Sequence, residues 1–223
     1  MTCLLIILGT LALALTQVLI FLYAPTEASL GLCQKIFYLH LPLAWWGLIS
    51  FFIVFIASIV SLLKPKPWAH ALALASAEIG EVLAILTVIT GMIWGRVAWG
   101  VWWTWDPRLS TALILCFIYA GYLLLNQLDL TSTRRQKLAA ILGILGFLDV
   151  PLVFMSARLW RSIHPAVFTS QGAAMSSEML ITLLVALGSF GVWWAGLIRL
   201  RFQILKNEEQ IDQLETLALQ KNN

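Results

Sequence analysis

Charged residues are scarce in this chain of 223 residues. Asp, Glu, Lys and Arg make up only 11% of it, whereas 61% of its residues are hydrophobic. Ordinary soluble domains carry about 25% charged residues, and the mean hydropathy here is +0.89. A soluble fold is therefore excluded, and the composition places the chain in a lipid bilayer.

Cysteine motifs are missing as well. The three cysteines, Cys3, Cys33 and Cys116, form no C-x-x-C pair, and no C-x-x-C-H sequence is present. The second motif is the one that attaches haem covalently to a polypeptide. The chain is therefore not itself a c-type cytochrome.

Six long apolar runs account for most of the sequence. Each is close to the roughly 20 residues that cross a bilayer as a helix, whereas a β-barrel would show shorter, alternating segments. We predict an all-α integral membrane bundle of six transmembrane helices. The expected spans are about 3–23, 41–63, 72–94, 109–127, 138–156 and 178–198. No Lys or Arg precedes the first run, which is longer than the apolar part of a signal peptide, so we expect it to be retained.

Basic residues predict the orientation of the bundle. With six spans, both termini lie on one side together with the loops at 64–71 and 128–137. That side carries nine of the 14 Lys and Arg residues and the opposite side carries five, so the termini are expected in the cytoplasm. Residues 1–198 form the membrane domain in this interpretation. Residues 199–223 form a cytoplasmic tail, either a short amphipathic helix or a frayed polar segment.

Tryptophan is concentrated in one outward loop, at about 94–110. The stretch from Trp94 to Arg108 reads W-G-R-V-A-W-G-V-W-W-T-W-D-P-R and holds five of the chain's 11 tryptophans. Indoles are enriched at membrane interfaces in general, but an aromatic belt needs only scattered residues. The densest part comprises Trp99, Trp102, Trp103 and Trp105. Such a surface is suited to a large, planar, apolar ligand, and haem fits that description.

Two arginines bracket the tryptophan cluster. A guanidinium fork matches the geometry of a carboxylate, so Arg96 and Arg108 are candidates for binding the two propionates of haem. They are equally suited to pairing with lipid headgroups or with Asp106.

The three histidines divide between the two sides of the membrane. His40 and His164 are expected in outward loops, and His70 on the cytoplasmic side. Neutral imidazole is a standard axial ligand of haem iron, although a lone loop histidine is often simply solvated. Because proline disfavours helical backbone in the residue before it, Pro42 and Pro165 lead us to expect both outward histidines at the ends of elements.

Three acidic residues fall inside the expected spans: Glu78, Glu81 and Asp149. Ionisable groups are costly in a bilayer and face the bundle interior, a partner helix or water. Glu78 and Glu81 share a helix face, so they could form a polar path or a docking site. A role in helix packing and a protonated structural role remain open as well.

The sequence W-G-V-W-W-T-W-D-P-R, with His40 in the outward segment before it and His164 in the one after, resembles the WWD signature of haem-handling membrane proteins. Chain length and span number resemble the CcmC family, haem exporter protein C of cytochrome c maturation. Relatives of the CcmF and CcsA types have more spans and additional histidines. The resemblance implies a surface for haem b on the periplasmic side of a bacterial inner membrane, with His40 and His164 as axial ligands of the iron. It assigns haem contacts to Trp99, Trp102, Trp103, Trp105, Asp106, Arg96 and Arg108.

The resemblance also implies a task and partners. Such a protein is a haem-loading subunit rather than an enzyme. It passes haem to the periplasmic chaperone CcmE and works beside an ABC-type assembly of CcmA and CcmB with the small protein CcmD. The chain contains no G-x-x-x-x-G-K-[ST] sequence, in keeping with ATP hydrolysis by another subunit.

Two other functions remain as alternatives. A b-type electron-transfer cytochrome would usually carry its ligating histidines on the spanning helices. A transporter subunit for a non-haem substrate could use the buried acids, but it leaves the tryptophan cluster unexplained.

Overall fold

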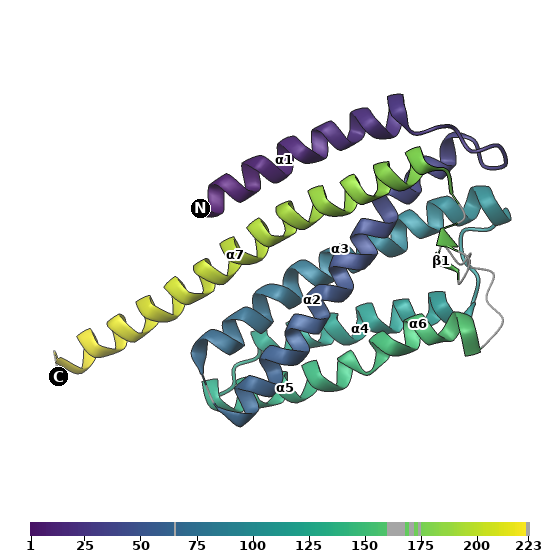
Figure 1. Cartoon of the computed structure of the whole chain (residues 1–223). Coiled ribbons are helices and arrows are strands. Elements are labelled where there is room, and N and C mark those ends of the chain that lie inside the picture. The colour runs from purple at the N-terminus through teal and green to yellow at the C-terminus, as the bar shows by residue number, and fades with distance from the viewer. Residues whose placement is uncertain (65, 160–167, 170–171, 174, 222–223) are drawn as a thin grey trace.

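A computed structural model describes residues 1–64, 66–159, 168–169, 172–173 and 175–221. This part of the chain is almost entirely helical (Figure 1). The helices are α1 (Thr2–Val18), α2 (Phe37–Leu63), α3 (Pro67–Trp99), α4 (Pro107–Gln127), α5 (Ser132–Phe147), α6 (Asp149–Leu159) and α7 (Ser177–Lys221). A π-helical turn, Leu19–Tyr23, extends α1, and a 3-10 helix, Leu32–Ile36, leads into α2. The strands β1 (Phe168–Thr169) and β2 (Gly172–Ala173) form a short antiparallel pair between α6 and α7.

The all-α fold with six membrane spans is confirmed. In the described ranges, six helical segments are long and apolar enough to cross a bilayer. Several helices run beyond the expected spans, because hydropathy marks the hydrocarbon core whereas a helix continues into the headgroup region. The fifth span consists of two helices, α5 and α6. They meet at Leu148, whose N–H bonds to the Leu145 carbonyl at 3.1 Å in a tighter turn.

Helix α7 is much longer than the expected sixth span. Its 45 residues correspond to about 67 Å at about 1.5 Å per residue, roughly twice the hydrocarbon thickness. The yellow end of α7 therefore projects past the other helices in Figure 1. Residues 199–221 continue this helix, as an amphipathic helix requires, and the apolar side chains of Ile211, Leu214 and Leu217 are exposed along it.

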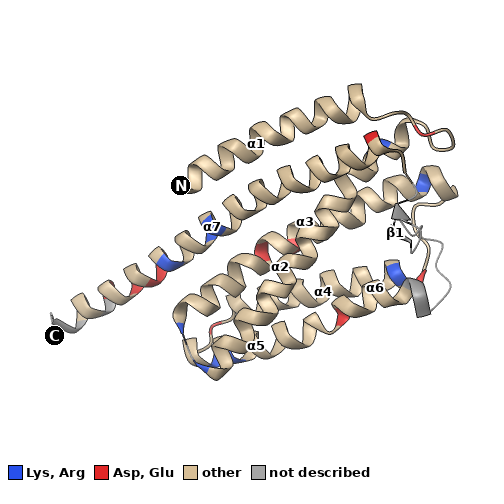
Figure 2. Ribbon diagram, viewed as in Figure 1, with Lys and Arg blue, Asp and Glu red and all other residues tan. Residues whose placement is uncertain are grey.

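The helices are arranged around a central pair. Helices α2 and α3 lie in the middle, with α1 and α7 on one side and α4, α5 and α6 on the other (Figure 1). The main core packs Phe51 of α2 against Tyr119 of α4, with stacked rings 3.7 Å apart. The connections from α1 to α2 and from α3 to α4 lie at one end of the bundle, together with the end of α6, the strands β1 and β2, and the start of α7 (Figure 1). The sequence predicts that this end faces outward. Most of the ribbon between the two ends lacks charge (Figure 2).

Candidate functional site

His40 lies inside helix α2, so the expectation that it ends a loop is wrong. The helix begins at Phe37 and includes Pro42 in its second turn. A proline there removes one backbone hydrogen bond and disfavours helical backbone before it. That preference is outweighed by packing, because Tyr38, Pro42 and Leu43 are all buried.

The His40 ring rests against helix α3. Its Nδ1 lies 3.0 Å from the hydroxyl oxygen of Thr90, and Thr90 is buried. A Cβ atom at Gly91 would come within 3.2 Å of His40 Cε1, so glycine at this position lets the imidazole lie close to the helix. We call Thr90 and Gly91 the His40 seat. The sequence interpretation missed both residues.

Helix α3 also carries the start of the tryptophan motif. It runs to Trp99 and ends at Gly100, whose φ of +77° is left-handed and favours glycine. The loop in the structure is therefore shorter than the predicted one, because Trp94, Arg96 and Trp99 are helical. Thr90 and Trp94 are four residues apart, so they share a helix face about 6 Å apart along the axis. His40 is thereby placed next to the beginning of the motif.

The indoles form two edge-to-face pairs. The rings of Trp94 and Trp99 lie 5.1 Å apart at 87°, and those of Trp103 and Trp105 lie 5.9 Å apart at 82°. Trp102 and Trp105 keep 55% and 79% of their surface exposed. Large apolar area thus remains open where α3 joins α4.

Asp106 has a structural role at the end of the motif. It is buried, and its carboxylate accepts the backbone N–H of Arg108 at 2.9 Å, which caps the start of α4. Pro107 occupies the first helical position, where its missing N–H is harmless. Asp106 therefore fixes where the non-helical part of the connection ends and α4 begins.

The two arginines differ in their surroundings. Arg96 is exposed, and its guanidinium donates to the carbonyl of Gly100. Arg108 is half-buried, and its Nε donates to the carbonyl of Val153 on α6 at 3.4 Å. Arg96 is thus the more accessible to an incoming ligand, whereas Arg108 ties α4 to α6.

His164 lies outside the described residues. The described backbone on either side of it ends at Leu159 in α6 and resumes at Phe168 in β1. The end of α6 and the strand β1 lie at the same end of the bundle as the connection between α3 and α4 (Figure 1).

The first outward segment has a defined shape. Lys35 donates to the carbonyls of Ile20 at 2.7 Å and Phe21 at 3.3 Å, near the end of the first span. The carboxylate of Glu27 accepts the backbone N–H groups of Leu30 and Ser29. These bonds lower the pKa of Glu27, so it is ionised and holds the turn at neutral pH.

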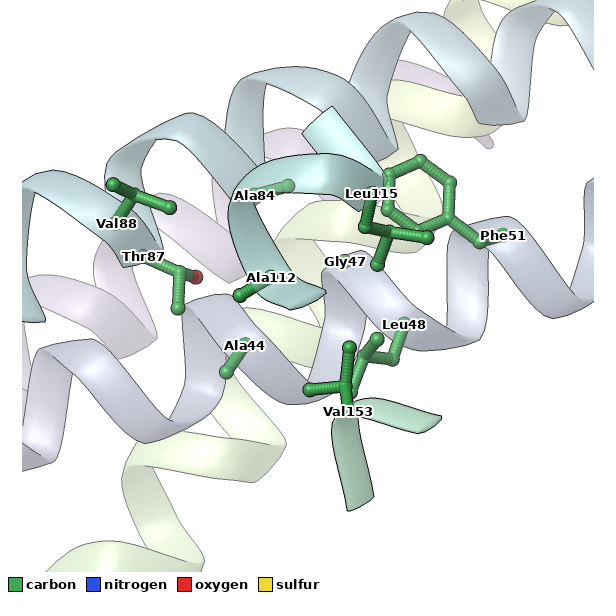
Figure 3. A pocket seen from close by; sticks show the side chains of 10 residues that line it. All are labelled: Ala44, Gly47, Leu48, Phe51, Ala84, Thr87, Val88, Ala112, Leu115 and Val153. Carbon is green, nitrogen blue, oxygen red and sulfur yellow. The ribbon is translucent and has the colours of Figure 1, made fainter. Parts of the chain in front are cut away.

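A small apolar cavity lies between helices α2, α3, α4 and α6 (Figure 3). Its volume is about 60 Å³, well below the roughly 300–1,000 Å³ of pockets that enclose drug-sized ligands. Ala44 and Leu48 follow His40 at steps of four residues, which places the cavity one to two helical turns deeper on the same face. It is lined by Ala44, Gly47, Leu48, Phe51, Ala84, Thr87, Val88, Ala112, Leu115 and Val153. The cavity is too small for haem. The candidate surface is therefore the exposed indoles of Trp102 and Trp105 where α3 joins α4, which we call the rim.

Comparison with known families identifies the family of this chain. The family model for heme exporter protein C, CcmC, matches residues 1–215. The chain belongs to the CcmC family. The protein from Haemophilus influenzae is 31% identical over 200 residues, covering 88% of this chain and 81% of that protein. The one from Bradyrhizobium diazoefficiens is 33% identical over 187 residues, covering 83% and 70%.

Family membership establishes a multi-pass membrane protein with a role in haem handling for cytochrome c maturation. A ccmC-like mitochondrial protein of cytochrome c biosynthesis from Marchantia polymorpha is 31% identical over 168 residues, 75% of this chain and 71% of that protein. The helical position of His40 removes one argument against a b-type cytochrome. Membership of the CcmC family is now the observation that argues against a b-type electron-transfer cytochrome.

The buried acids of this CcmC-family member have separate surroundings. Glu81 and Asp149 are 6% and 7% exposed. Each has one carboxylate oxygen without a hydrogen-bond partner among the described residues. Glu78 instead forms a two-point ion pair with Arg201, in which Nη2 lies 2.9 Å from Oε1. Glu78 thus joins α3 to α7, which favours the role in helix packing for this residue.

Replacing Glu78 with glutamine is expected to weaken the attachment of α7. The pair is about a third exposed on each side, so we expect a loss of about 1 kcal/mol and a fall in the unfolding temperature of about 2–4 °C in detergent. Haem content should not change, because Glu78 lies 12 residues, about 18 Å, before Thr90 on α3. Glu208→Gln is the matched control, since Glu208 is 59% exposed and 3.8 Å from Arg201. Equal effects of the two variants would contradict this role.

Proposed function

We propose that this chain holds haem b at the periplasmic face of the bacterial inner membrane and delivers it to the chaperone CcmE. The observation that carries the proposal is the position of His40. Its imidazole is seated on α3 one helical turn from Trp94, and exposed indoles follow directly. An imidazole beside a flat apolar surface matches the two main requirements of haem, an axial ligand and a place for the porphyrin.

Each candidate residue has a separate proposed role in haem binding. His40 and His164 are the proposed axial ligands of the iron. The exposed indoles of Trp102 and Trp105 offer area to the porphyrin face, with Trp99 and Trp103 beside them. Arg96 is the better placed partner for a propionate, because it is exposed at the start of this surface. Asp106 acts through its cap on α4, and Arg108 through its contact with α6.

An open surface is appropriate for a protein that must give its ligand away. Haem bound on the rim stays accessible to a second protein, whereas haem enclosed in the bundle would first require the helices to part. The periplasmic location rests on the excess of Lys and Arg at the opposite end. CcmA, CcmB and CcmD are the proposed partners. The projecting end of α7 lies at the end of the bundle opposite the connection between α3 and α4 (Figure 1), which is the proposed cytoplasmic end and hence the proposed side for a nucleotide-binding subunit.

The visible absorption spectrum of the protein purified in detergent tests haem binding. We expect haem to co-purify and to show a low-spin spectrum with two imidazole ligands. A haem-free protein that also fails to take up added haem would overturn the proposal. Delivery is tested in cells that produce this chain and CcmE. Haem-loaded CcmE should accumulate, and its absence in spite of haem on this chain would refute delivery alone.

A further inference from the structure

We infer that Thr90 is a positioning residue, which holds the His40 imidazole in the tautomer protonated on Nδ1. This tautomer presents the lone pair of Nε2 to a metal. The second part of the inference rests on the proposed function, because it takes haem iron as that metal. The first part concerns the chain alone.

Three acceptor or donor atoms surround the Thr90 hydroxyl. Its oxygen lies 2.8 Å from the carbonyl oxygen of Leu86 and 3.1 Å from that of Thr87. It also lies 3.0 Å from His40 Nδ1. The threonine is 8% exposed, so water has little access to compete for these contacts.

The single hydroxyl proton determines which way each bond runs. Both carbonyl oxygens are acceptors only, so the hydroxyl oxygen lies favourably at hydrogen-bond distance from them only if the Thr90 proton points to their side. If that proton pointed to His40 instead, the hydroxyl oxygen would face two carbonyl oxygens at 2.8 and 3.1 Å without a hydrogen. The proton therefore goes to the carbonyls, and the hydroxyl accepts a hydrogen bond from His40. His40 must then carry its proton on Nδ1.

This arrangement suits an axial ligand. A ligating histidine commonly donates its second ring N–H to a nearby acceptor, which fixes the tautomer and the ring orientation. Gly91 adds a steric contribution, because its lack of a side chain lets His40 Cε1 lie against α3. The His40 seat thus holds the ring by one hydrogen bond, from Nδ1, and by close packing of Cε1 against Gly91.

Replacement of Thr90 by valine removes the hydroxyl and keeps the shape. We expect haem affinity to fall by about 10–100-fold, as losses of such outer partners do, and the midpoint potential of the remaining haem to rise, because the imidazole becomes a weaker donor. Thr90→Ser keeps the hydroxyl and should therefore show the wild-type haem affinity and midpoint potential. Thr87→Val is the matched control, because Thr87 also bonds back along α3, to Leu83 at 2.8 Å, and should change neither.

The tautomer itself is measurable without haem. The ¹⁵N shifts of labelled histidine in the haem-free protein distinguish Nδ1–H from Nε2–H, and His40→Asn assigns the signal. Nδ1–H in the wild type and its loss in Thr90→Val is the expected result, and Nε2–H in the wild type overturns the inference. The inference is also overturned if Thr90→Val keeps the wild-type haem affinity and midpoint potential while His40→Ala loses its haem. Normal haem binding by His40→Ala would instead refute ligation, while leaving the tautomer assignment to the NMR result.

Discussion

Replacing His40 with alanine is expected to remove nearly all haem from the purified protein. The variant loses an axial ligand, so affinity should fall by more than the roughly 10–100-fold typical of an outer partner. The low-spin spectrum should disappear even when haem is added back, and loading of CcmE should stop. Haem content per protein, measured after gel filtration, is the quantity to compare.

The controls separate ligation from general damage. His70→Ala removes the same side chain from α3, but 20 residues before Thr90, about 30 Å away, and it should keep normal haem content. His164→Ala is expected to behave like His40→Ala if both histidines bind the iron. Normal haem content in both outward variants would rule out axial ligation by histidine.

The membrane fold was predictable because its main constraint acts on composition. A helix that crosses a bilayer needs about 20 apolar residues, so each span is visible in the sequence as a nearly continuous apolar stretch. The helix ends were less predictable. Helix α3 continues through Gly95 to Trp99 and stops at Gly100, whose backbone is left-handed, and the sequence alone does not distinguish which of the two glycines ends the helix. The division of the fifth span at Leu148 depends on packing, which a hydropathy pattern does not contain.

The candidate site was only partly predictable. The density of tryptophans indicated an aromatic surface, and the position of two of the three histidines in outward segments on either side of it indicated His40 and His164, before the WWD resemblance added to both. The proline rule failed at Pro42 because the burial of its neighbours outweighs a local preference. Thr90 was missed because its partner lies 50 residues away on another helix. A threonine in an apolar span is unremarkable until the neighbouring helix is known, although its spacing of four from Trp94 offered a hint.

A single methyl group on Gly9 is expected to loosen α1 from the bundle. In the described part of the chain, α1 buries little of its surface, and it approaches α7 closely where glycines permit. A Cβ at Gly9 would lie 2.6 Å from the Trp193 Cα atom, and backbone cannot rotate aside as a side chain can. Gly9→Ala should therefore destabilise the protein by about 1–3 kcal/mol, as overpacking does.

Alanine at Gly188, a glycine of the partner helix α7, is expected to stabilise the protein instead. A Cβ atom at Gly188 of α7 would meet no atom of the described residues within 4 Å, so Gly188→Ala should stabilise the helix by up to about 1 kcal/mol. Cross-linking reports on the interface directly, because the hydroxyls of Thr16 and Ser189 are 3.0 Å apart. A cysteine pair at those positions, in a background without the native cysteines, should form a disulfide that Gly9→Ala suppresses and Gly188→Ala does not. If both alanine variants gave the same unfolding temperature and cross-linking yield, close packing through Gly9 would not hold α1 in place.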